Sequence, residues 1–183
     1  HLRRVGKHPP HARPGRHHRG GPHPRGGAMA DDLAQAPGPR DGKCDRRGRF
    51  FAGTLAIDTT PGHGALYRLD PDGRCRQVDD GFHISNGLGW SPDDRRFYFT
   101  DSGARRIYVY DYDIETGALA RRRTFVDLPE STGTPDGLAV DAEGFVWSAH
   151  WDGWCVTRYD PDGRVDRVIN LPVPRPTSCA FGG

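Results

Sequence analysis

Short runs of aromatic and β-branched residues alternate with polar residues along most of this chain. The runs at residues 96–101 and 106–112 are separated by a Ser-Gly turn, which is typical of two strands of a hairpin. Glycine and proline together account for 41 residues, which favours short strands and many turns over long helices. We expect strands at residues 48–56, 65–69, 74–78, 87–90, 96–101, 106–112, 119–126, 137–140, 145–149, 156–160 and 164–171.

One phrase occurs three times: an apolar residue, an acidic or glycine-containing turn, and then an aromatic or β-branched run. The copies are centred on Gly48, Asp94 and Gly144, so the chain repeats in steps of 46 and 50 residues. A repeat of roughly 40–50 residues with several short strands in each unit is typical of a β-propeller blade. The sequence therefore predicts an all-β fold, a partial propeller of about three four-stranded blades. A ring needs more blades than this, so two faces would remain without a neighbouring blade.

The first forty residues differ in composition from the rest. Residues 1–40 contain six of the nine histidines and carry eight Lys or Arg against two Asp, a net charge of +6. Because the whole chain has a charge of +2, residues 41–183 carry −4. We expect residues 1–40 to be a disordered leader and residues 41–183 to form the propeller domain. A metal-binding or nucleic-acid-binding tail is the alternative for the leader, and a solvated extension is the simpler interpretation.

Cysteine use and hydropathy place limits on compartment and partners. The cysteines at 44, 75, 155 and 179 have no CxxC spacing, and we expect all four to be reduced and buried. No apolar run approaches the ~18 residues of a membrane span, and the domain has no basic aromatic face for nucleic acid. We therefore predict a cytoplasmic protein with no nucleic-acid or membrane partner.

Two short phrases occupy equivalent places, just before the predicted innermost strand of a blade. They are Ser85–Leu88 (Ser-Asn-Gly-Leu) and Thr134–Leu138 (Thr-Pro-Asp-Gly-Leu). Loops at that place border the central channel of a propeller, where the Asn86 and Asp136 oxygens are donors suited to a hard divalent cation. Asn-Gly and Asp-Gly are also the strongest short turn signals, so plain turns remain the alternative at this point.

Residues 41–183 resemble the SMP-30/gluconolactonase/regucalcin family of six-bladed propellers. The resemblance rests on Asp41–Lys43, Gly48–Thr54, Gly64–Tyr67, Ser85–Leu88, Pro135–Asp141 and Pro176–Gly183. It implies a metal-dependent sugar lactonase that acts on a small-molecule sugar lactone. It also implies one divalent cation (Ca²⁺, Zn²⁺ or Mn²⁺) held by a first-blade Glu, by Asn86 and by Asp136. Asp58 corresponds to an acidic substrate contact, with a solvated loop acid as the alternative.

No matching first-blade Glu stands upstream of Asp41, and the chain begins with His rather than Met. We therefore expect an incomplete copy of the family domain, with its activity impaired by truncation.

Three functions remain open. The leading one is metal-dependent lactone hydrolysis, in which Asp136 is the catalytic base that accepts the proton of the attacking water. The second is a non-catalytic calcium-binding propeller of the regucalcin type, and the third is a structural propeller. No Gly-x-Ser-x-Gly elbow supports a serine hydrolase. His150 either faces the channel or packs beside Trp151 and Trp154, which we expect to fill space between blades.

Overall fold

The computed structural model describes residues 40–56 and 58–182, and its regular structure is almost entirely β. The described strands form three four-stranded antiparallel sheets, here called blades 1, 2 and 3. The predicted disordered leader lies outside the described residues except for Arg40. Blade 1 consists of β1 (Asp41–Cys44), β2 (Phe50–Gly53), β3 (Gly64–Leu69) and β4 (Cys75–Phe82). Blade 2 consists of β5 (Ser85–Trp90), β6 (Arg96–Asp101), β7 (Arg106–Asp113) and β8 (Ala118–Asp127). Blade 3 consists of β9 (Thr134–Val140), β10 (Val146–Trp151), β11 (Cys155–Tyr159) and β12 (Val165–Asn170).

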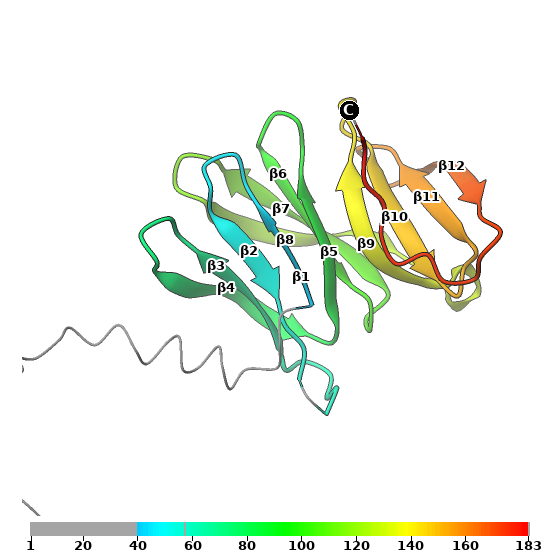
Figure 1. Ribbon diagram of the computed structural model, residues 1–183, viewed down its shortest axis with the longest axis horizontal. Coiled ribbons are helices and arrows are strands. Elements are labelled where there is room, and N and C mark those ends of the chain that lie inside the picture. Colours follow the sequence, from blue (N-terminus) through cyan, green and yellow to red (C-terminus); the bar gives the residue numbers. More distant parts are fainter. Residues whose placement is uncertain (1–39, 57, 183) are drawn as a thin grey trace, which may run out of the picture.

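The strands of each blade pair in sequence order, so every blade is an up-and-down meander. β1, β5 and β9 are the first strands of their blades and contact one another, β1 with β5 and β5 with β9. Figure 1 shows the three sheets side by side, with β5 between β1 and β9. These first strands therefore form the inner edge of the molecule, as expected for part of a propeller.

Two hydrophobic clusters hold the blades together. Blade 1 packs on blade 2 through buried aromatic residues, among them Phe51, Phe97 and Phe99. Blade 2 packs on blade 3 through a second cluster that includes Tyr98 and Leu138. Consecutive residues of β6 thus point to opposite faces, which is the period of two that the sequence displays. Burying one phenylalanine completely stabilises the fold by about 1.5–3 kcal/mol.

Arginines reinforce both junctions at the outer ends of the strands. The Arg49 guanidinium pairs with Asp45 at 2.6 Å and also donates to the main-chain oxygen of Ile114 in blade 2. Arg96 of blade 2 donates to the main-chain oxygen of Pro161 in blade 3 at 2.9 Å. Carbonyl oxygens in a turn have lone pairs that no strand partner uses. Each arginine therefore hydrogen-bonds one blade to a turn of the next blade.

The two Asp-Pro-Asp-Gly segments form the turns that the sequence predicts. Gly73 and Gly163 have φ of 83° and 84°, a conformation that glycine adopts without strain. The amide of each glycine donates to the main-chain oxygen of the first aspartate at 2.9 Å. These turns close the β3–β4 and β11–β12 hairpins.

Three expectations need correction. Residues 41–44 form a strand that the alternation did not predict. Ser85–Leu88 and Thr134–Leu138 lie within β5 and β9 rather than in loops before them, so the plain-turn alternative is wrong. All four cysteines are free, but Cys155 alone is buried, while Cys44 is exposed.

In the described part of the chain, no helix is long and apolar enough to cross a bilayer.

Candidate functional site

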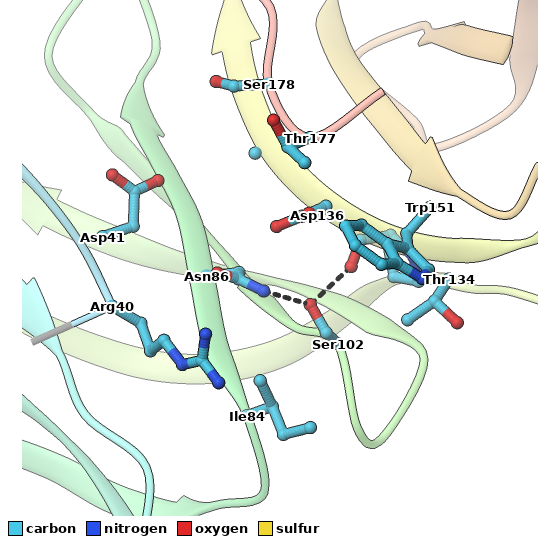
Figure 2. Close-up of a pocket in the computed structure, with 12 residues that line it drawn as sticks. Arg40, Asp41, Ile84, Asn86, Ser102, Thr134, Asp136, Trp151, Thr177 and Ser178 are labelled. Carbon is cyan, nitrogen blue, oxygen red and sulfur yellow. Dashed lines mark hydrogen bonds between the residues drawn. The ribbon is translucent and has the colours of Figure 1, made fainter. Parts of the chain in front are cut away.

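A pocket of about 620 Å³ lies at the inner edge, where β5 of blade 2 meets β9 of blade 3 (Figure 2). Side chains from both blades reach it, and the segments before β1 and after β12 complete it. Its lining residues are Arg40, Asp41, Ile84, Asn86, Ser102, Thr134, Pro135, Asp136, Gly137, Trp151, Thr177 and Ser178.

Asn86 and Asp136 both line this pocket, one from each innermost strand. The ladder between β5 and β6 is irregular between Ser85 and Leu88, so the strand is locally distorted at Asn86. Such irregularities re-aim side chains and are common beside functional sites. The structure therefore brings the two predicted oxygen donors to one cavity.

Gly87 and Gly137, which follow the two oxygen donors, have no side chain and so allow a neighbouring segment to pack closely. A Cβ on Gly87 would lie 2.3 Å from the Leu138 nitrogen and 2.6 Å from the Asp136 main-chain oxygen. A Cβ on Gly137 would lie 2.7 Å from the Thr177 main-chain oxygen, and the Gly137 amide donates to that oxygen at 2.8 Å. Each glycine lets the next segment approach closely, so the donors of adjacent segments converge.

The Asp136 carboxyl has a raised pKa of about 6. Burial is the main cause, and repulsion from Asp41 adds to it. Arg40 and the Gly137 amide act in the opposite direction. The carboxyl therefore changes charge near pH 6. At neutral pH it is ionised in spite of an unfavourable desolvation free energy, which a nearby positive charge would offset.

Ser102 belongs to the site although its residue type and spacing gave no sequence signal. Its hydroxyl donates to the Pro135 main-chain oxygen at 2.5 Å. The Asn86 side-chain amide donates to the same Ser102 hydroxyl at 2.7 Å. Figure 2 shows both contacts, one from Asn86 of β5 to Ser102 and the other from Ser102 to the segment of β9 that carries Asp136.

The tryptophans differ from expectation, and of the two alternatives for His150 the structure excludes the one in which it faces the pocket. Trp151 is 38% exposed and lines the pocket, and Trp154 is also exposed, so neither fills space between blades. The ring of Trp151 instead carries the Arg175 guanidinium, 5.0 Å from its centroid. His150 is buried, where its Nδ1 contacts the Thr132 oxygen at 2.8 Å, and burial lowers its pKa. It lies outside the residues that line the Asn86–Asp136 pocket.

Asp58 lies on an exposed segment after β2 and is not among the residues that line the pocket. Its carboxylate accepts the Thr60 amide at 3.1 Å, and hydrogen bonding from Thr60 lowers its pKa. Its role as a substrate contact stays a prediction.

Within residues 40–56 and 58–182, no three His, Cys, Asp or Glu side chains are grouped so that they could hold a metal ion. The pocket does offer the amide oxygen of Asn86 and the carboxylate of Asp136, with Asp41 close enough to repel Asp136. Hard oxygen donors of this kind suit Ca²⁺ or Mn²⁺, with water at the remaining positions, better than nitrogen- and sulfur-preferring Zn²⁺. The residues present therefore fit an oxygen-ligated divalent cation.

Comparisons with known proteins agree with this fold. The family described as "SMP-30/Gluconolactonase/LRE-like region" matches residues 28–183. Pentonolactonase XacC of Haloferax volcanii is 48% identical over 139 residues, which cover 76% of this chain and 47% of that protein. Human regucalcin is 44% identical over 149 residues, covering 78% of this chain and 50% of regucalcin.

A solved gluconolactonase from Xanthomonas campestris superposes with a TM-score of 0.67 at 30% identity, covering 78% of this chain and 50% of that one. The chain thus spans about half the length of the curated relatives it matches. Since the family match extends over most of its residues, the chain belongs to the SMP-30/gluconolactonase/LRE-like family.

Proposed function

We propose that the Asn86–Asp136 pocket hydrolyses a small sugar lactone with the help of one bound divalent cation. The observation that carries the proposal is the convergence of an amide oxygen and a desolvated carboxyl in one cavity. Relatives named pentonolactonase and gluconolactonase support the reaction class. We also propose a cytoplasmic location, with no nucleic-acid or membrane partner.

Asp136 is the proposed general base. Its carboxylate accepts a proton from water as the water oxygen bonds to the lactone carbonyl carbon, and it returns that proton to the ring oxygen when the bond between that oxygen and the carbonyl carbon breaks. Without a cation, burial and Asp41 raise its pKa above that of an ordinary aspartate, and a cation bound at the same carboxylate would act in the opposite direction.

Asn86 and Asp136 would hold the cation, which when bound polarises the lactone carbonyl and acidifies water. Asn86 is a neutral donor, so it adds no negative charge that would offset the charge of the cation. The polar side chains of Thr134 and Ser178, together with the exposed Trp151 ring, line the same cavity. They can contact sugar hydroxyls and the apolar face of a sugar ring.

The second candidate is a calcium-binding protein without catalysis, of the regucalcin type. It is favoured by the same two oxygen donors and by the similarity to regucalcin. It shares cation binding with the first candidate but does not require proton transfer by Asp136.

The test is hydrolysis of pentono- and hexono-lactones by the 183-residue chain, with and without Ca²⁺, Mn²⁺ or Zn²⁺. We expect a cation-stimulated rate that Asn86→Ala reduces and that Asn170→Ala, on the exposed edge strand β12, leaves unchanged. Calorimetric titration of the same cations runs in parallel. Cation binding without any lactone turnover would support the calcium-binding protein. The absence of both cation binding and lactone turnover would refute both candidates.

A further inference from the structure

We propose that Ser102 is a positioning residue that turns the Asn86 side-chain amide so that its oxygen faces the pocket. The inference deepens the proposed function, because it explains why Asn86 would present its oxygen rather than its nitrogen to a cation. Its structural part concerns only the orientation of the amide and can be tested without any cation.

The argument starts from the donors and acceptors around Ser102. A serine hydroxyl has one proton, and the Pro135 main-chain oxygen can only accept a hydrogen bond. The 2.5 Å contact between them therefore commits the single proton of Ser102 to blade 3. The lone pairs of the hydroxyl oxygen are left to face Asn86.

Those lone pairs require a donor. The Asn86 amide has one side that only donates and one that only accepts, so its nitrogen must face Ser102 at 2.7 Å. The Asn86 oxygen is then turned away from Ser102, into the cavity that Asp136 also lines. The flipped amide would place two oxygens against each other without a proton between them, which is strongly disfavoured.

Ser102 can hold this orientation because it is itself fixed. Its side chain is nearly inaccessible, with the residue 5% exposed. Its amide donates to the Ile84 oxygen at 2.8 Å. The neighbouring Asp101 is also buried and accepts the amides of His83 and Ile84 at 3.0 Å each. The loop after β6 is thereby tied to the segment that leads into β5.

The same hydroxyl also connects the two halves of the site. Asn86 belongs to blade 2, whereas Pro135 directly precedes Asp136 in blade 3. A chain of two hydrogen bonds, from Asn86 to Ser102 and from Ser102 to the Pro135 main-chain oxygen, therefore links the segments that carry Asn86 and Asp136. Partners that orient a ligand typically contribute 10–100-fold in metal affinity when the ligand is part of a metal site.

The first test reads the orientation directly. The chain has two asparagines and two glutamines, so the side-chain amide region of a ¹⁵N–¹H spectrum is sparse, and loss of one signal in Asn86→Ala assigns it. We expect the Asn86 amide protons to exchange slowly with solvent in the wild type and at least ~10-fold faster in Ser102→Ala. The exposed Asn170 amide should exchange quickly in both.

Two further variants separate positioning from simple packing. Ser102→Thr keeps the hydroxyl and should retain slow exchange. Ser85→Ala removes a neighbouring buried hydroxyl that has no hydrogen-bond partner among the described residues, and it should change nothing. Equal exchange in Ser102→Ala and the wild type would overturn the proposal.

The second test reads the consequence for the cation. In calorimetric titrations with Ca²⁺ and Mn²⁺, we expect Ser102→Ala to weaken binding by about 10–100-fold and Ser102→Thr to stay within about 3-fold of the wild type. If the wild type binds neither ion while its Asn86 amide is protected, the orientation stands and the proposed function fails. If Ser102→Ala loses protection of the amide but keeps full affinity, the positioning role is wrong.

Discussion

The innermost strands of blades 2 and 3 follow one plan and carry different chemistry at the same position. Both strands contain a donor, a glycine and a leucine, and both glycines accommodate a neighbouring segment at close range. Asn86 is neutral and is held by a hydrogen bond to Ser102, whereas Asp136 is partly desolvated and repelled by Asp41. The repeat therefore supplies the geometry twice, and a single difference in residue type places a neutral amide at one position and a titratable carboxyl at the other.

The largest expected effect comes from removing the acid of this pair. Asp136→Asn keeps the shape of the side chain but cannot accept a proton, so lactone turnover should fall by about 10²–10⁴-fold. Steady-state kinetics with a saturating cation measures it. Asp127→Asn, on the exposed outer strand of blade 2, is the matched control and should retain full activity. A loss below 10-fold would show that Asp136 is not the base.

The next largest effect is expected on stability, from Gly87, the glycine that follows the oxygen donor in β5. Gly87→Ala places a methyl group against backbone atoms of β9, which cannot move aside, so unfolding free energy should fall by about 3 kcal/mol or more. Gly89→Ala, in the same strand, meets only the side chains of Leu138 and Val140 at 3.1 and 3.2 Å and should cost much less. Urea denaturation compares the two. Equal losses would mean that close approach of the strands is not the reason for Gly87.

A smaller effect should appear in the pH dependence of stability without cation. The Asp136 pKa is about 6 in the folded state and near 3.8 when unfolded, so the folded state binds the proton more tightly. Stability from this group is present below pH 4 and is lost as pH rises towards 6, by about 1–2 kcal/mol after allowance for solvent screening. Asp136→Asn should abolish that part of the decline. Parallel curves for the two proteins in denaturant titrations between pH 4 and 7 would contradict the raised pKa.

The smallest effect is expected at Asp58, which lies outside the pocket lining. A single hydroxyl contact at an exposed position is worth about 1 kcal/mol, so Asp58→Ala should raise KM by a few-fold and leave kcat unchanged. Thr60→Ala removes part of the hydrogen bonding to Asp58 and serves as the comparison. An unchanged KM in both variants would leave Asp58 as a solvated loop acid.

Much of the fold was predictable because strands depend on local alternation and turns depend on glycine. Eleven of the described strands overlap predicted ones, and both Asp-Pro-Asp-Gly turns form as expected. The exception is β1, whose four residues show no alternation and become a strand by pairing with β2. Its register with β2, from Asp41 opposite Gly53 to Cys44 opposite Phe50, depends on a partner further along the chain.

Burial was much less predictable. Leu69, Tyr110 and Tyr159 each pair with the first or second residue of the preceding strand in their blades, yet they are 41%, 2% and 3% exposed. Tyr110 and Tyr159 lie in the clusters between blades, whereas Leu69 lies on the face of blade 1 that turns away from blade 2. The same pattern therefore gives a core residue or a surface residue according to what packs against it.

The sequence by itself determined the repeated unit, its turns, and the two residue types able to donate oxygen to a cation. These features depend on local backbone preference and on side-chain chemistry, which a chain carries wherever it folds. Only the tertiary structure decided that Asn86 and Asp136 share a cavity, that Ser102 orients one of them, and that burial, with Asp41, raises the pKa of the other. Those properties arise from distances between residues on different strands and blades, which the pairing of the strands and the packing of the blades set.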